Sequence, residues 1–378
     1  MWNEAIEHAL LVTSSNIDRF GGRYPHVSED GRHYALNDND EWTNGFWSGI
    51  LWLCYEYSKD GKFRQAALDT IESFRDRLER QHELDHHDIG FLYSLSTKAH
   101  WILEKDDTSR AVTLQAADHL MKRWREKTQL IQAWGPENHP TNGGRIIIDC
   151  LMNLPLLFWA SEQTGNPLYR ERALIHLDKS RRFLIRGDDS SYHTFYFDQE
   201  TGDAQRGGTQ QGYRDGSTWT RGHAWGIYGF ALAYRYVRQP EYLDTARRLA
   251  RYFLDRLPED HVVYWDFDAP QTQGTYRDSS ASAIAVSGLL EIVSHLEAGD
   301  PDRTTFQEAV HRIMNSLTRH YSTIGDPDAQ GLLKHGSYYV RGNLSKDDYM
   351  IWGDYYYLEA LMRLDRGVPG YWYERERG

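Results

Sequence analysis

The chain has 378 residues and carries 43 Lys and Arg against 55 Asp and Glu, which gives a formal net charge of −12. A chain of this length can bury a large hydrophobic core. Its acidic balance argues against general binding of nucleic acids or of anionic membranes. No apolar run reaches the length that a membrane-spanning helix needs, so no membrane partner is expected.

Residues 1–20 lack a basic leading segment and include acidic residues, a pattern that predicts an amphipathic helix and not a signal peptide. Cys54 and Cys150 both lie in apolar runs, as expected of small buried residues in a reducing compartment. We therefore expect a cytoplasmic protein. No Pro-, Gly- or Ser-rich linker divides the sequence, which predicts a single domain over residues 1–378. We expect a monomer or a weak oligomer.

Two kinds of helical segment alternate along the chain. The amphipathic segments, each with one charged face, are residues 2–19, 62–80, 108–126, 167–185, 240–257 and 302–322. The other segments are aromatic-rich and apolar nearly all round, as expected of helices that are buried on both sides. These apolar segments begin near Trp42, Asp88, Gly144, Thr218, Ser279 and Asp348. Strand-like alternation occurs only in short stretches at 193–198 and 262–267.

The connections between these segments are of two lengths. Those that lead from an apolar to an amphipathic helix are tight turns, whereas most of those that lead back are long, and long loops in compact domains are usually functional. Six inner helices ringed by six outer ones predict an all-α fold, a closed (α/α)6 barrel or six-hairpin toroid, with the long loops on one face. That face lies above the N-termini of the inner helices, where free N–H groups favour an anionic ligand. The alternative is an open helical solenoid that serves as a binding scaffold.

Asp149 stands near the start of an apolar segment, in the run RIIIDCLMNLPLLFW over residues 145–159. A buried carboxyl group is costly unless it is hydrogen-bonded or used, and burial raises its pKa so that it can act as a general acid near neutrality. The alternative is a structural Asp that binds loop backbone. Pro155, later in the same run, is expected to bend the helix or open one of its hydrogen bonds.

Asp88 closes the run Asp85-His86-His87-Asp88 and is placed to be the N-cap of the helix that follows. A cap at the mouth of a pocket can also bind substrate. The run resembles a metal site, but adjacent residues rarely point at one ion, and no spaced ligand set such as HExxH is present. We therefore expect no metal.

Polar and aromatic residues are densest over residues 186–221. The candidates for polar contacts there and just beyond are His193, Gln211, Arg221 and His223. A cation in the first turn of a helix opposes the helix dipole, so Arg221 is expected to have a carboxylate partner from the ligand or from the protein, for example Asp215 or Asp189.

Large aromatic residues lie at or near the same helix ends. They are Trp42, Trp134, Trp219, Trp225, Tyr338 and Trp352. Apolar rings stack on the C–H faces of sugars, so aromatic residues together with carboxylates in one cleft indicate a carbohydrate ligand. Any single Trp is more often a core residue, and only the clustering at one end favours a ligand wall.

Several long motifs, in order and spacing, resemble the bacterial unsaturated glucuronyl hydrolases of glycoside hydrolase family 88. Among them are NDNDEWTNGFWSGILWLCYEY, LDHHDIGFLYSLS, WGPENHPTNGGRIIIDCLMNLPLL, GGTQQGYRDGSTWTRGHAWGIYGFAL and DDYMIWGDYYYLEALMRL. The resemblance implies an (α/α)6 barrel that removes 4,5-unsaturated glucuronic acid from the non-reducing end of lyase-generated oligosaccharides. Such oligosaccharides come from glycosaminoglycans or bacterial polysaccharides. The reaction hydrates an enol ether, so the usual two-carboxylate schemes of glycosidases do not apply directly.

The resemblance also implies roles for individual residues. Asp149 would be the general acid/base that protonates C4 of the double bond, and Asp88 would hold the unsaturated ring by its hydroxyls. The surrounding pocket would comprise Trp42, Trp134, His193, Gln211, Trp219, Arg221, Trp225 and Tyr338, with Asn44 and His87 as further candidates. No metal or organic cofactor is implied, and the expected partners are unsaturated glucuronyl di- and oligosaccharides. The alternatives are an unsaturated rhamnogalacturonyl hydrolase, a sugar epimerase or isomerase, and a non-catalytic carbohydrate-binding scaffold.

Overall fold

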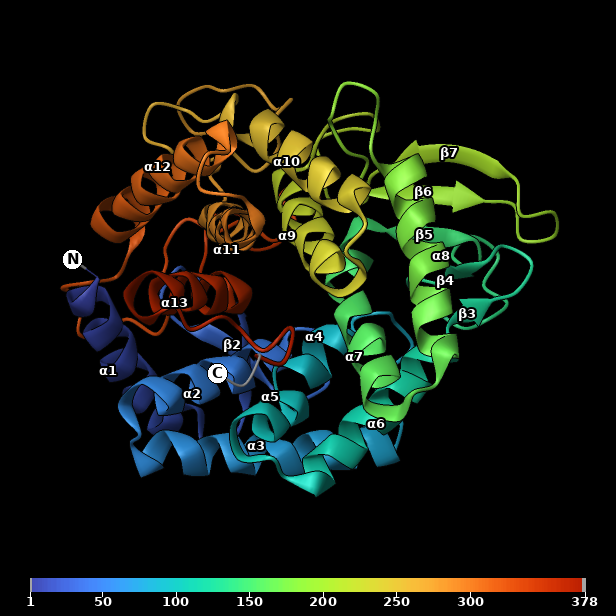
Figure 1. Ribbon diagram of the computed structural model, residues 1–378. Helices are drawn as coiled ribbons and strands as arrows, with labels where there is room; N and C mark the ends of the chain where they lie inside the picture. The colour runs from blue at the N-terminus through green and yellow to red at the C-terminus, as the bar shows by residue number, and fades with distance from the viewer. Residues whose placement is uncertain (1, 376–378) are drawn as a thin grey trace.

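The computed structural model describes residues 2–375, and most of this part of the chain is helical, as predicted (Figure 1). The amphipathic segments form helices α1 (Asn3–Phe20), α3 (Gly61–Glu79), α6 (Asp107–Met121), α8 (Pro167–Leu184), α10 (Pro240–Leu254) and α12 (Pro301–Ser316). The apolar segments form α2 (Asn44–Ser58), α4 (Ile89–Ser94), α5 (Thr97–Glu104), α7 (Leu154–Thr164), α9 (Thr220–Val237), α11 (Ser279–His295) and α13 (Ile351–Arg366).

The two kinds of helix are buried in the two ways that their sequences predict. In α9 every residue from Thr220 to Ala233 is buried, so this helix has no solvent face. In α3 the buried positions recur every three or four residues, at Phe63, Ala67, Ile71, Phe74 and Leu78 among others. An apolar stripe of this kind seals an outer helix onto an inner one.

The inner helices contact one another in chain order. Helix α2 packs against α4, α4 against α7, α7 against α9, α9 against α11 and α11 against α13. Helix α13 also packs against α2, although the two lie near opposite ends of the sequence. Figure 1 shows these helices around a common centre with the outer helices outside them.

Short turns join each inner helix to the next outer one. The inner helices α2, α5 and α9 end on a residue in the left-handed conformation, at Lys59, Lys105 and Arg238. A side-chain oxygen then caps the outer helix in four of these turns, from Asp60, Asp106, Asn166 and Asp300. Caps of this type satisfy backbone N–H groups that a helix start leaves free.

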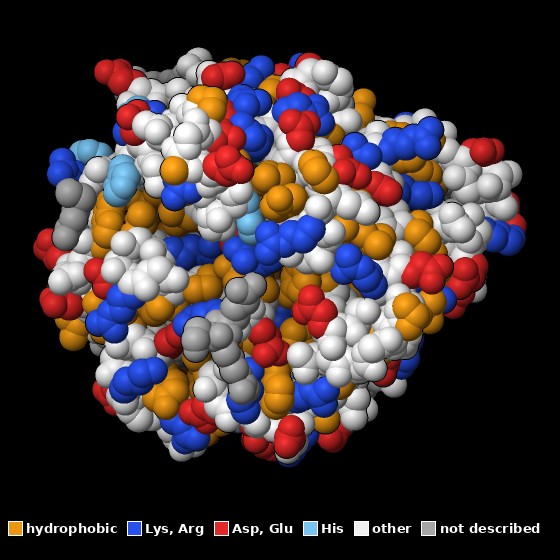
Figure 2. Space-filling view, viewed as in Figure 1, with side chains coloured by type: hydrophobic (Ala, Val, Ile, Leu, Met, Phe, Trp, Pro, Cys, Tyr) orange, Lys and Arg blue, Asp and Glu red, His pale blue; other side chains and the backbone are white. Residues whose placement is uncertain are grey.

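The segment around Trp372 packs against several of the inner helices. Trp372 is fully buried, stacks on Tyr356 of α13 and donates its indole N–H to Glu359 at 3.0 Å. Lys98 and Tyr236 both donate to the Trp372 carbonyl at 2.7 Å. The segment around Trp372 therefore fills the space between these inner helices. Figure 2 shows Lys and Arg side chains near the centre of the face that is seen in Figure 1.

The third apolar segment differs from the prediction that a helix begins near Gly144. Residues Arg145–Ile147 form strand β5, a 3-10 turn follows over Ile148–Met152, and α7 begins only at Leu154. Pro155 consequently lies in the first turn of α7, where its missing N–H costs nothing. The expected bend at Pro155 was therefore wrong, because the helix starts there and does not run through it.

The second apolar segment is also interrupted. Helix α4 ends at Ser94 and α5 begins at Thr97, because Ser96 between them has φ −109° and ψ −93°, outside the helical region. The connections carry further strands that the sequence analysis did not predict. They are β1 (Tyr24–Ser28), β2 (Tyr34–Asn37), β3 (Trp124–Arg125), β4 (Leu130–Ile131) and β7 (Ala204–Gly208).

The predicted strand at 193–198 is confirmed as β6 (Thr194–Phe197), which pairs antiparallel with β5 and β7. The predicted strand at 262–267 is wrong, since only isolated bridges form there, such as Tyr264 with Arg277. Cys54 and Cys150 are buried free thiols, as predicted. Among residues 2–375 no helix is long and apolar enough to cross a membrane.

Candidate active site

Within residues 2–375, several side-chain polar atoms are buried without a hydrogen-bond partner in the protein, and six of them lie near the N-terminal ends of the inner helices. They are Asp149 Oδ1, His193 Nε2, Arg221 Nε, Arg145 Nη2, Trp225 Nε1 and His87 Nδ1. Buried polar groups are normally paired, so such a set indicates a place where a polar ligand supplies the missing partners. The charges of Arg145 and Arg221 both act on Asp149 and on His193, which puts these four residues in one neighbourhood.

Asp149 lies in the 3-10 turn that follows β5, with only 9% of its surface exposed. The pairing of β5 with β6 fixes this turn, because the Ile148 N–H donates to the His193 carbonyl at 3.0 Å. Burial first, and then the charge of Asp88, raises the pKa of Asp149 to about 7, although Arg221 and Arg145 oppose the rise. Asp149 therefore keeps its proton up to about pH 7, as a general acid requires.

Asp88 occupies the N-cap position of α4, but its side chain makes no capping hydrogen bond. Its carboxylate instead lies 3.4 Å from His86 Nδ1 and 3.5 Å from His87 Nε2. Burial disfavours the charged form, but His87, His86 and Asn153 outweigh it and hold the pKa of Asp88 below its ordinary value. The predicted cap is thus wrong for the side chain, which stays ionised beside a protonated Asp149.

His193 is a neutral donor. Its Nδ1 lies 3.0 Å from the Gln210 N–H and 3.3 Å from the Gln211 N–H and accepts from both, so the ring proton sits on Nε2. Burial holds the pKa of His193 well below its ordinary value. The ring packs on Trp219 at 4.5 Å between centroids, which aims a fixed N–H group at the site.

Arg221 has a carboxylate partner, as predicted, but the residue is Asp278, at 3.3 Å. The suggested partners are engaged elsewhere, Asp215 with the backbone of Thr209 and Asp189 with Arg248. The Arg221 guanidinium also donates to the carbonyls of Ser337 and, at 2.8 Å, Tyr338. These contacts use both terminal nitrogens and leave Nε free.

Aromatic rings from distant segments meet around these polar groups. The ring centroid of Trp352 lies 5.3 Å from that of Trp42 and 5.5 Å from that of Tyr338. The Arg221 guanidinium carbon lies 4.4 Å from the centroid of the Trp219 ring. Trp225, one turn after Arg221, is fully buried and contacts Phe91 at 5.2 Å. The Gln211 amide donates to the Tyr338 carbonyl at 3.2 Å and ties two of the long loops together.

Three of the candidates have other surroundings. Trp134 stacks on the Arg145 guanidinium at 4.5 Å, and its backbone pairs with His86. Asn44 is fully buried, and its side chain holds the backbone of Glu41 and the side chains of Asn37 and Arg77. The structure therefore places Asn44 in the framework of the loop before α2.

His223 is also part of the framework. One ring nitrogen lies 3.0 Å from the Ser191 hydroxyl and the other 2.9 Å from the Leu249 carbonyl. Both nitrogens are thus paired inside the protein, and His223 offers nothing to a ligand.

Two residues of the site, Arg145 and Asp278, were not predicted from the sequence. Arg145 is four residues before Asp149, yet only the pairing of β5 with β6 turns both toward the same space, and strand β5 was not predicted. Asp278 caps α11 by accepting from the Ser280 and Ala281 N–H groups, and an Asp just before an apolar helix is a signal that could have found it.

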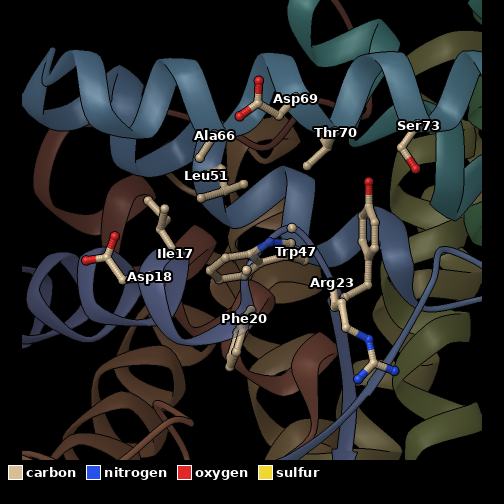
Figure 3. Close-up of a pocket in the computed structure, with 13 residues that line it drawn as sticks. Ile17, Asp18, Phe20, Arg23, Trp47, Leu51, Ala66, Asp69, Thr70 and Ser73 are labelled. Carbon is tan, nitrogen blue, oxygen red and sulfur yellow. The ribbon is translucent and has the colours of Figure 1, made fainter.

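A cavity of about 370 Å³ opens elsewhere, between α1, α2 and α3, and contains none of the candidate residues (Figure 3). Its polar groups already have partners, such as Thr70 with Ser48 and Asp69 with Gln65. It lacks the unpartnered donors that mark the site at the inner helix ends. Within residues 2–375, no group of three or more His, Cys, Asp or Glu side chains is arranged to hold a metal ion.

The chain is similar to known proteins over nearly all of its length. The model of Glycosyl Hydrolase Family 88 matches residues 16–366. The chain is 62% identical to an unsaturated glucuronyl hydrolase of Bacillus sp. (strain GL1) over the full length of both, and superposes on its crystal structure with a TM-score of 0.99. It is 46% identical to an unsaturated chondroitin disaccharide hydrolase of Streptococcus pyogenes serotype M1, over 98% of this chain and 92% of the relative.

A further match is a mutant unsaturated glucuronyl hydrolase of Streptococcus agalactiae, solved in complex with dGlcA-GalNAc6S. It is 42% identical, covers 98% of this chain and 93% of its own, and has a TM-score of 0.87. The chain therefore belongs to glycosyl hydrolase family 88.

Proposed function

We propose that this protein is an unsaturated glucuronyl hydrolase that removes the non-reducing-end 4,5-unsaturated glucuronic acid from lyase-generated glycosaminoglycan oligosaccharides. The observation that carries the proposal is the pair of buried carboxyl groups, Asp149 protonated and Asp88 ionised, inside a cluster of unpartnered polar atoms. The relative from Bacillus is described as responsible for glycosaminoglycan degradation, and the one from S. agalactiae binds an unsaturated disaccharide of this kind.

The two carboxyl groups would divide the chemistry between them. Asp149 gives its proton to C4 of the C4=C5 double bond, and the positive charge that develops is shared by C5 and the ring oxygen. Water adds to C5 and returns a proton to the Asp149 carboxylate, so the acid is regenerated. The hemiketal at C5 then opens by breaking its bond to the ring oxygen, and the hemiacetal left at C1 releases the aglycone.

Asp88 would hold the ring for this step. As an ionised, acceptor-only group it takes hydrogen bonds from the ring hydroxyls, and its charge keeps the proton on Asp149. The His193 Nε2–H and the Arg221 Nε–H would supply donors to the polar edge of the substrate. Trp42, Trp219, Trp225 and Tyr338 would cover the apolar faces of the sugars.

The same proposal extends to the architecture. The contacts of α13 with both α11 and α2 support a closed (α/α)6 barrel, and one continuous hydrophobic core from Trp2 to Tyr373 supports a single domain over residues 1–378. We further propose a monomer or weak oligomer that acts in the cytoplasm, which the two buried free thiols support.

The test follows the ultraviolet absorbance of the substrate double bond. Unsaturated disaccharides from chondroitin, hyaluronan, gellan and rhamnogalacturonan are incubated with wild type, Asp149→Asn and Asp88→Asn. A matched control is Asp354→Asn, because Asp354 is another buried acid with a pKa raised to about 7 by burial, but it binds Tyr34 and the Leu333 backbone, away from the cluster. Loss of absorbance with wild type and the control but not with the two variants supports the proposal.

Other outcomes would point elsewhere. Turnover of the rhamnose-linked fragment alone would indicate an unsaturated rhamnogalacturonyl hydrolase. Binding without turnover of any unsaturated uronide would leave a carbohydrate-binding scaffold, and an epimerase would convert a saturated sugar and leave the double bond intact.

A further inference from the structure

Asn153 links the two carboxyl-bearing elements through a single fully buried side chain. Its Oδ1 accepts from the Phe91 N–H at 2.8 Å, and its Nδ2 donates to the Asp149 carbonyl at 3.2 Å. Phe91 is the third residue of α4, the position whose N–H an N-cap side chain ordinarily binds. Asn153 therefore performs, from the turn that precedes α7, the capping role that Asp88 leaves unfilled.

The chain makes room for this contact at Gly90. A Cβ atom there would lie 2.4 Å from the Asn153 Cα and 2.7 Å from its Oδ1, far inside van der Waals contact. Only a glycine allows α4 to approach the turn between Met152 and Leu154 so closely. The Asn153 backbone is fixed as well, since its N–H donates to the Cys150 carbonyl at 2.8 Å and its carbonyl accepts from Leu156.

We propose that Asn153 is a positioning residue of the active site, which caps α4 in place of Asp88 and so frees the Asp88 carboxylate to hold the substrate while fixing the Asp149 turn beside it. The inference rests on the proposed function for its consequence in catalysis, but its structural part concerns the free protein. Asn153 is also one of the groups that lower the pKa of Asp88, which agrees with a donor facing that carboxylate.

The test compares wild type with Asn153→Ala, which removes cap and donor, and Asn153→Asp, which keeps the capping oxygen but loses the donor. Asn16→Ala is the matched control, because Asn16 is also buried and donates its amide to a backbone carbonyl, that of Gln330 at 2.7 Å, outside the site. Thermal unfolding, kcat and KM across pH are measured for all four proteins on an unsaturated chondroitin disaccharide.

Both Asn153 variants should lose kcat by about 100-fold or more, within the usual range for a misplaced acid/base pair. Because Asn153 is one of the groups that lower the pKa of Asp88, Asn153→Ala should also lose activity on the acid side at a higher pH than wild type. Asn16→Ala should keep its kcat within about threefold even at an equal loss of thermal stability. Asn153 variants that lose no more kcat than the control, or keep the wild-type acid limb, overturn the inference.

A second measurement tests the effect of Asn153 on Asp88 without enzymatic turnover. Carbon-13 carboxyl NMR of aspartate-labelled wild type and Asn153→Ala, with Asp88→Asn to identify the signal, reports the Asp88 titration in the free protein. The signal should titrate at higher pH in Asn153→Ala, and an unchanged titration refutes the inference. Wild type without any activity would refute the proposed function alone.

Discussion

The carboxylate of Asp88 acts on Asp149 as a buried like charge and, added to burial, raises the pKa of Asp149 to about 7. Ionising both of two buried carboxyl groups that act on each other costs electrostatic free energy, so one keeps a proton while the other stays charged. The polar neighbours of each carboxyl group decide which of the two stays charged. His86, His87 and Asn153 surround Asp88, whereas Asp149 Oδ1 has no partner in the protein.

This division predicts the pH dependence of the reaction. Asp149 must be protonated, so kcat/KM should be constant below about pH 7 and fall about tenfold for each further pH unit above it. The acid limb should lie far lower, because the pKa of Asp88 is depressed. Initial rates of absorbance loss between pH 4 and 9 check this profile. A rate that rises through pH 7–8 would show that Asp149 works only as an ionised base.

The same shift predicts that Asp149→Asn stabilises the protein while abolishing its activity. The folded pKa, about 7, lies above the ordinary value of 3.8, so ionisation of Asp149 opposes folding. Wild type should lose stability relative to Asp149→Asn as the pH rises from about 4 to 7, by at most roughly 4 kcal/mol, and no further above that. Urea unfolding of both proteins at several pH values measures the difference.

A stability gap that is independent of pH would contradict this argument. Asp354→Asn is the informative control, since the pKa of Asp354 is also raised to about 7 by burial. That variant should show a gap of the same sign and keep its activity. Comparing Asp149→Asn with Asp354→Asn would separate the effect of a buried carboxyl group on stability from its role in catalysis.

The helical pattern was predictable from sequence because burial follows periodicity. Continuous apolar runs gave α2, α9, α11 and α13, and single stripes gave the outer helices. The 3-10 turn of Asp149 was not predictable in this way. Residues 145–148 read as the start of an apolar helix, and only their pairing with Thr194–Tyr196, about fifty residues away, makes them a strand.

Residues of the candidate site could be predicted from the sequence, but their hydrogen-bond partners could not. Asp88, Asp149, His193 and Arg221 stand out as polar residues next to buried runs, and the structure brings all four together. The Asp278 partner of Arg221 and the Asn153 cap of α4 are contacts across 57 and 62 residues. No local pattern encodes such pairs, because loop closure and helix packing create them.

His193 is expected to act through its N–H group and not through a charge. His193→Leu and His193→Asn should both raise KM by on the order of 10- to 100-fold, the usual effect of losing one buried donor to a ligand. In His193→Asn the amide oxygen can still accept from the Gln210 N–H, so that variant isolates the donor from the loop anchor. Because burial holds the pKa of His193 well below its ordinary value, the pH profiles of wild type and of both variants should show no titration near pH 6.5. Steady-state kinetics of the two variants would contradict this assignment if KM stayed at the wild-type value.

Arg145 is expected to set the upper limit of the pH profile. Its guanidinium is almost fully buried between Trp134 and Tyr196, anchored by the Thr194 hydroxyl, and its charge lowers the pKa of Asp149. Arg145→Met removes that charge, so Asp149 should keep its proton to higher pH and the alkaline limb of kcat/KM should move upward.

The control for this shift is Arg125→Met. Arg125 is also partly buried and holds Gln132, but its charge is not among those that act on Asp149. Its removal should leave the limb in place. If Arg145→Met raised KM while the alkaline limb stayed at the wild-type pH, Arg145 would act only by holding the Trp134 ring. A shift of the limb, seen in kcat/KM across pH 6–9, would instead identify Arg145 as a cation that, beside Arg221, keeps Asp149 acidic enough to release its proton to carbon.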